Sequence, residues 1–147
     1  MSDESEIVIK LAQRLVREMG EHAYRWDRAF IRFHHGGNNY GTSGSFIADG
    51  EVRLFDVFKH EHLMDDMRSD FLTLHSLLEV EGKAFCVALL IVDSHLNFKI
   101  LFEHDNLDAW KIDKLDSDGI PRGFDNSLPL GKVLPQTSPK PWWKFWQ

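Results

Sequence analysis

The 147-residue sequence contains a single cysteine, Cys86, which excludes an intrachain disulfide. A chain of this length buries roughly 68–70% of its unfolded surface, so it can fold without crosslinks. Cys86 lies in an apolar stretch, where we expect a buried thiol in a protein of a reducing compartment.

Long apolar runs are missing as well. The longest run, residues 84–92, is far too short to span a bilayer. An acidic segment opens the chain and no apolar core follows it, so we expect no secretory signal. These absences predict a soluble, cytoplasmic protein that does not bind membranes.

Positive charge is scarce, because 17 Lys and Arg residues face 23 Asp and Glu residues, for a net charge of −6. An acidic surface repels phosphate backbones, so we predict no direct binding of nucleic acid. It attracts a basic partner instead. The composition, 43% hydrophobic and 27% charged, is typical of a folded globular domain.

Two segments have the apolar spacing of an amphipathic helix. The first covers about residues 4–19 and is expected to end at Gly20. The second covers about residues 60–80 and is expected to end at Gly82.

Alternating or continuous apolar residues predict five strands. Three of them lie between residues 23 and 57, with Ala29, Ile31 and Phe33 on one face and Trp26 and Phe30 on the other. Asp49-Gly50 is a strong hairpin turn signal between the second and third strands. Residues 84–92 predict a central strand buried on both faces, and residues 98–103 a fifth strand.

The predicted fold is therefore α+β, in the order α-β-β-β-α-β-β, with one antiparallel sheet covered by helices. We expect a single domain over residues 1–120. Residues 121–147 contain all five prolines and predict an irregular extension packed on the domain or on a partner. Within the core, we expect three residues of the second helix to pack on three residues of the central strand: Met67, Phe71 and Leu74 on Val87, Leu89 and Ile91.

Histidines suggest a metal site at His60-Glu61-His62, with His34 and His35 as further ligands. Residues two positions apart do not face each other on a helix, and the His-Glu-x-x-His spacing of zinc proteases is absent. No cysteine cluster completes a structural zinc site. We therefore predict no metal and no cofactor, and a metal-dependent enzyme using His60 and His62 is the less favoured alternative.

Other catalytic motifs are absent too. The glycine-rich residues 36–45 lack the Gly-Lys-Ser/Thr ending of a phosphate loop, and a hairpin loop is the better interpretation. The serines lack the Gly-x-Ser-x-Gly turn that exposes a nucleophile. We predict no catalytic residues.

Residues 103–118 hold six acids, and this segment has two interpretations. It is either a solvated surface loop or an electrostatic docking surface. In the second interpretation Glu103, Asp105 and Asp108 ring an apolar anchor, Trp110, for a basic partner. The helix acids Asp65, Asp66 and Asp70 are the next candidate surface.

Several short sequence motifs are similar to motifs of one known family: residues 26–30, Gly44-Ser45-Phe46 before the Asp49-Gly50 turn, Leu90 to Asp93, Asn97 to Asp105, and Trp110. On these motifs the chain resembles the YezG-like family of antitoxin or immunity proteins over about residues 5–113. The resemblance implies a small acidic cytoplasmic protein that binds and neutralises a cognate bacterial toxin domain, often a nuclease. It carries no fixed set of binding residues onto this sequence.

The C-terminus places four aromatic residues in a five-residue stretch: Trp142, Trp143, Phe145 and Trp146. We expect this stretch to dock on the domain or on a second copy, because an exposed aromatic cluster promotes association. A homodimer, or a homo-oligomeric scaffold built through this tail, is a further alternative to the immunity function.

Overall fold

The computed structural model describes residues 3–22, 25–36, 39–55, 60–112, 119–126 and 129–134, and these form an α+β fold. The elements are α1 (Asp3–His22), β1 (Trp26–Gly36), β2 (Asn39–Ala48), β3 (Glu51–Leu54), α2 (Glu61–Val80), β4 (Val87–Asp93), β5 (Asn97–Glu103) and β6 (Lys132–Val133). The predicted order of two helices and five strands is confirmed. The short strand β6, in the proline-containing segment, was not predicted.

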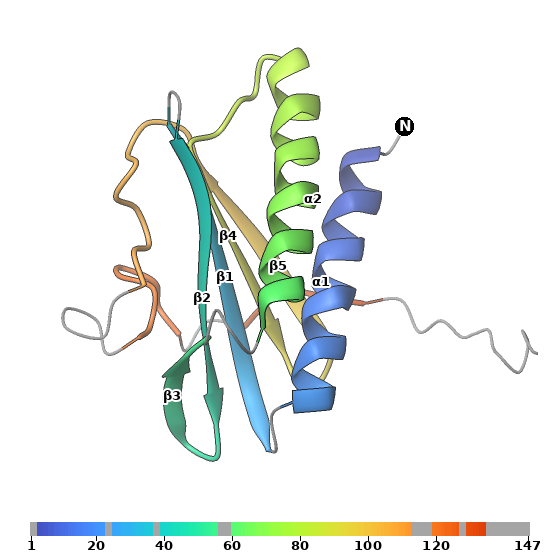
Figure 1. The fold of residues 1–147 in the computed structure, drawn as a ribbon, viewed down its shortest axis with the longest axis vertical. Coiled ribbons are helices and arrows are strands. Elements are labelled where there is room, and N and C mark those ends of the chain that lie inside the picture. The colour runs from blue at the N-terminus through green and yellow to red at the C-terminus, as the bar shows by residue number, and fades with distance from the viewer. Residues whose placement is uncertain are drawn as a thin grey trace, which may run out of the picture.

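The strands form one antiparallel sheet in the order β3-β2-β1-β4-β5-β6. Both helices lie side by side on one face of the sheet, and the chain after β5 runs along the opposite face (Figure 1). The expectation that helices cover the sheet therefore holds for one face only. No helix in the described part of the chain combines the length and apolar character needed to cross a membrane.

The main core lies between the helices and the sheet. Leu11 and Leu15 of α1 are fully buried there, as is Phe71 of α2. The Phe71 ring stacks on Phe33 of β1, with centroids 5.1 Å apart and ring planes 6° from parallel. This contact ties the middle of α2 to the centre of the sheet.

A second, smaller core lies on the opposite face of the sheet. Phe30 of β1 and Leu89 and Ile91 of β4 are fully buried there, together with Leu130. Partly buried apolar side chains from the segment after β5 complete this core: Trp110, Ile112, Ile120 and Phe124. Both faces of β4 are thus buried, one by the two helices and the other by the described residues after β5.

The prediction that Leu89 and Ile91 meet α2 is wrong. Ala88, Leu90 and Val92 face the helices, while Leu89 and Ile91 face the second core. Residues 87–92 of β4 are all apolar and all buried, so no polar side chain among them marks one face as outward.

Two further predictions are wrong: the side of the sheet that Trp26 faces, and the residue at which α1 ends. Trp26 packs against the main core beside Ala29, not on the face of Phe30, because a bulge shifts the β1–β2 register between Trp26 and Arg28. The helix α1 also continues through Gly20 to His22. Gly20 is exposed and has no positive φ, so it does not act as the helix stop.

The two turn signals built on glycine are confirmed. Asp49 and Gly50 have φ values of 54° and 80°, which are typical of the two-residue turn that joins β2 to β3. Gly82 follows α2 with φ 78° and ends the helix. The third strand is shorter than predicted and ends at Leu54, and residues 56–59 lie outside the described part.

The described portion of the C-terminal segment packs on the sheet. Arg28 donates to the Asn126 carbonyl oxygen at 2.8 Å, and the Ser45 hydroxyl donates to the Gly119 carbonyl oxygen at 2.5 Å. Leu134 is buried in the main core, next to β6. The aromatic stretch from Trp142 to Trp146 lies outside the described residues.

Candidate functional site

A buried arginine holds the acidic segment after β5. Arg32 is only 5% exposed, and its guanidinium donates to the carbonyl oxygens of Ala109 at 2.8 Å and Leu107 at 2.5 Å. Burial lowers the pKa of Arg32, and the nearby Asp108 carboxylate opposes that shift. Because arginine stays charged in proteins, these are charge-assisted hydrogen bonds that fix the path of the segment.

Glu103 shapes the turn at the end of β5. Its carboxylate accepts hydrogen bonds from the backbone amides of Asp105 and Asn106, at 3.1 and 3.0 Å. These bonds lower the pKa of Glu103, so the group is a carboxylate at neutral pH. Glu103 therefore serves the local structure as well as the surface charge.

The two aspartates beyond Glu103 are exposed. Asp108 forms an ion pair with Lys111 at 3.0 Å, and the hydrogen bond and charge of Lys111 lower its pKa. The Asp108 side chain is nevertheless 71% exposed. The exposed Asp105 carboxylate has no hydrogen bond or ion pair within the described residues, which leaves it available to a partner.

Trp110 packs on the fold. Its side chain is partly buried against the second core, and its backbone has a φ of 57°. The sequence left open whether this tryptophan anchors a partner or holds the loop to the sheet. The structure places it in contact with the sheet, with part of the ring still exposed.

An exposed apolar side chain, Leu107, lies among the acids of the loop, and no sequence pattern pointed to it. Leu107 is 43% exposed and Tyr40 is 47% exposed. Leu107 approaches β1 closely, since a Cβ on Gly36 would lie 2.8 Å from its Cδ2 atom. Tyr40 stacks on His35, which in turn stacks on His75 of α2, so Tyr40 lies on the helix-covered face of the sheet.

We call the surface formed by Glu103, Asp105, Leu107 and Asp108 the acidic end of the sheet. It combines carboxylates with an exposed apolar side chain, the composition of a protein-binding surface for a basic partner. The loop and the β1–β2 hairpin, far apart in the sequence, meet at this end of the sheet (Figure 1).

The helix acids are engaged elsewhere. Asp66 and Asp70 of α2 form ion pairs with Arg14 of α1, at 2.8 and 3.1 Å, and Lys10 lies 3.6 Å from Asp70. Asp65 pairs with Arg68 at 2.8 Å. Asp66 and Asp70 thus join the two helices, and Asp65 pairs within α2. None of the three extends the acidic end of the sheet, which α2 approaches with its C-terminal end (Figure 1).

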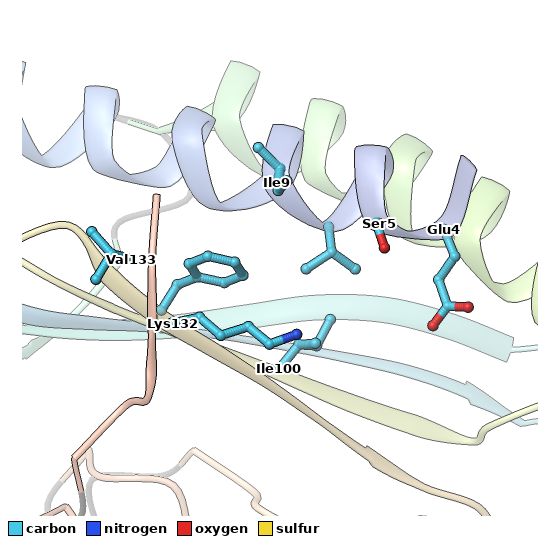
Figure 2. Close-up of a pocket in the computed structure, with 8 residues that line it drawn as sticks. Glu4, Ser5, Ile9, Ile100, Lys132 and Val133 are labelled. Atoms are coloured by element: carbon cyan, nitrogen blue, oxygen red, sulfur yellow. The ribbon is translucent and has the colours of Figure 1, made fainter. Parts of the chain in front are cut away.

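A pocket of about 400 Å³ lies between α1 and the strands β5 and β6. Its walls are mainly apolar, with Val8, Phe98 and Ile100 among them. Figure 2 shows Glu4 and Ser5 pointing from α1 toward the strands, and the Lys132 side chain extending toward Ile100. None of the seven residues that the sequence predicts to bind a partner lines this pocket. The pocket and the acidic end are therefore separate features.

The histidines singled out in the sequence fall into two places. His35 stacks on His75 of α2, with ring centroids 4.1 Å apart. His60 instead lies at the start of α2, where its Nδ1 atom is 2.6 Å from the Glu18 carboxylate of α1. The structure therefore does not join His34 and His35 to His60, and it pairs His60 with Glu18, which lies 42 positions away in the sequence.

Cys86 differs from expectation. It precedes β4 and is partly exposed, not buried within the strand. Burial and the Glu103 carboxylate raise its pKa, so the thiol stays protonated at neutral pH.

The chain matches no protein-family model and shows no significant similarity to a curated protein. The resemblance to the YezG-like family accordingly stays a prediction.

Proposed function

We propose that this chain is a cytoplasmic immunity protein that binds a basic, nuclease-type bacterial toxin domain and neutralises it. In this proposal the chain is a binding protein without catalytic residues or a cofactor. The resemblance to the YezG-like family points to the same class of function.

The acidic end of the sheet is the observation that carries the proposal. Asp105 and Asp108 are exposed at the tip of a loop that the buried Arg32 holds in place. A surface fixed before binding loses less conformational entropy when a partner docks. A nuclease domain must be basic to hold its phosphate substrate, so its substrate surface is complementary in charge to this end.

Leu107 supplies the apolar part of the surface. Charged groups at an interface mainly raise the association rate, whereas buried apolar contacts slow dissociation. The acidic end offers both kinds of group within one loop. Partly buried Trp110 lies three residues beyond Leu107 and holds the loop from beneath.

The test measures binding kinetics against the cognate toxin domain, to be sought in the gene next to this one, at two salt concentrations. Asp105→Lys combined with Asp108→Lys is expected to slow association, most strongly at low salt, where charges are least screened. Glu51→Lys is the matched control, because Glu51 is 70% exposed and lies at the β2–β3 turn, away from the acidic end. Leu107→Ala is expected to speed dissociation.

Melting curves on each variant separate lost binding from lost folding. If the acidic-end variants fold and bind like the parent, the docking surface is elsewhere, and Asp65→Lys tests the helix surface next. Failure of the parent chain to bind or inhibit the neighbouring toxin domain would overturn the proposed function.

A further inference from the structure

Two carboxylates and two imidazoles converge where the last turn of α1 meets the start of α2. Donor atoms of Glu18, Glu21 and His22 all lie within 4.8 Å of one another. His60 adds a fourth side chain from α2. We propose that Glu18, Glu21 and His22 bind a divalent transition-metal ion of the Zn²⁺ class, and that His60 positions Glu18 for this.

The spacing of the donor atoms fits one small ion. The His22 Nε2 atom lies 3.7 Å from a Glu18 oxygen and 3.9 Å from a Glu21 oxygen. Around tetrahedral zinc, with bonds near 2.0–2.2 Å, neighbouring ligand atoms lie about 3.3–3.5 Å apart. Small rotations of exposed side chains close the remaining difference, since Glu21 is 62% exposed and His22 is 41% exposed.

His60 provides the independent support, because it is fixed and buried. Its side chain is only 7% exposed, and its ring packs edge-on against Phe55 with centroids 5.0 Å apart. From this position Nδ1 contacts the Glu18 carboxylate at 2.6 Å. Hydrogen bonds of this kind orient the carboxylates that ligate metals, and their loss weakens metal binding about 10–100-fold.

The electrostatics of the site also favour a cation. Glu18, Glu21 and His22 lie in the last turn or so of α1, where the helix dipole is negative and stabilises positive charge. Two carboxylates balance the charge of a divalent ion. A mixture of imidazole nitrogen and carboxylate oxygen suits zinc and its neighbours better than calcium or magnesium, which prefer oxygen alone.

Three protein ligands leave a fourth position for water. All three ligands belong to α1, and the Glu18–His60 contact links the bound ion to the start of α2, 42 positions away in the sequence. It would therefore add stability to the junction of α1 and α2. This inference is independent of the proposed immunity function, because the site does not overlap the acidic end of the sheet.

The experiment titrates the full chain with Zn²⁺ in competition with a chromogenic chelator, and with Co²⁺ followed by its visible absorption. We expect one equivalent to bind, and the melting temperature to fall when a chelator removes it. Glu21→Gln and His22→Ala change exposed positions, so they are expected to fold and to lose binding at least tenfold. His62→Gln is the control, because His62 is an exposed histidine next to the site that contributes no ligand.

His60→Gln tests the positioning role, and a binding loss of about 10–100-fold in a folded variant is the expected result. Should His60→Gln fail to fold, Glu21→Gln and His22→Ala still decide the question of the ligands. The proposal is overturned if no stoichiometric Zn²⁺ binds, or if both ligand variants bind it as tightly as the parent and the His62 control.

Discussion

The Nε atom of Arg32, in the middle of β1, donates a hydrogen bond to the carbonyl oxygen of Ala109 at 2.8 Å, across 77 positions of sequence. A second bond from the same guanidinium reaches the Leu107 carbonyl oxygen. Together they hold the acidic loop against the face of the sheet opposite α1 and α2 (Figure 1).

Replacing this arginine is expected to free the loop. Arg32→Met removes both bonds, and a hydrogen bond to a charged group contributes about 1.5–3 kcal/mol, so the free energy of unfolding should fall by about 2–3 kcal/mol. Hydrogen exchange over residues 104–112 should quicken at the same time. Arg53→Met is the control, because Arg53 is 57% exposed and its pair with Glu51 is a surface ion pair. Equal stability of the two variants would contradict a role for Arg32 in fixing the loop.

Trp110→Ala is expected to lower stability by about 2–3 kcal/mol, because the ring is partly buried against the second core. A fully buried tryptophan would cost roughly 3–5 kcal/mol. Urea denaturation measures the change, with Leu107→Ala, at an exposed position of the same loop, as the comparison. A variant that unfolds like the parent but releases the toxin domain faster would show that Trp110 is a partner anchor instead.

Phe71→Ala is expected to lower the free energy of unfolding by about 3–5 kcal/mol, since its ring is fully buried and stacks on Phe33. Thr73→Ala, at an exposed position of the same helix, should change it little. Thermal melts of both variants test this. A Phe71→Ala variant melting within a degree or two of the parent would contradict the stacking of α2 on the sheet at this point.

Stability is expected to decrease as the pH falls below neutrality. Burial lowers the pKa of His75 below its unfolded value of 6.5, and the stacked His35 lowers it further, against the opposing charge of Glu79. Between the folded and the unfolded pKa of His75, the unfolded chain binds more protons than the folded one. The contribution of His75 to stability is therefore complete above pH 6.5 and declines as the pH falls toward the folded pKa. His34 shifts in the same direction.

Denaturation at about pH 5.5 and about pH 7.5, on either side of the unfolded histidine pKa, measures this effect. His75→Phe keeps an aromatic ring beside His35 and is expected to reduce the loss of stability, whereas exposed His62→Gln should leave it unchanged. Glu103 and Asp108 do not contribute in this range, because their lowered pKa values place their effect below about pH 4.5. The same pH dependence in the parent and in His75→Phe would contradict the assignment.

The sequence by itself determined the elements, because their signals are local. Repeats of apolar residues at helical spacing predict α1 and α2, and alternation predicts β5. Asp49 and Gly50 together favour the turn that joins β2 and β3, since both adopt positive φ there. The clustering of acids after β5 is equally visible in the sequence.

Only the tertiary structure decided which side chains meet. The apolar run of β4 has no polar residue to mark a face, so only its pairing with β1 and β5 shows that Leu90 faces the helices and Leu89 the second core. Arg32 alternates with apolar residues like a solvent-facing side chain, yet the loop that covers it comes from 77 positions away. The contact of Glu18 with His60 likewise depends on how α1 and α2 lie against each other. Such contacts follow from strand order, register and helix packing, which act between distant segments and leave no local pattern in the sequence.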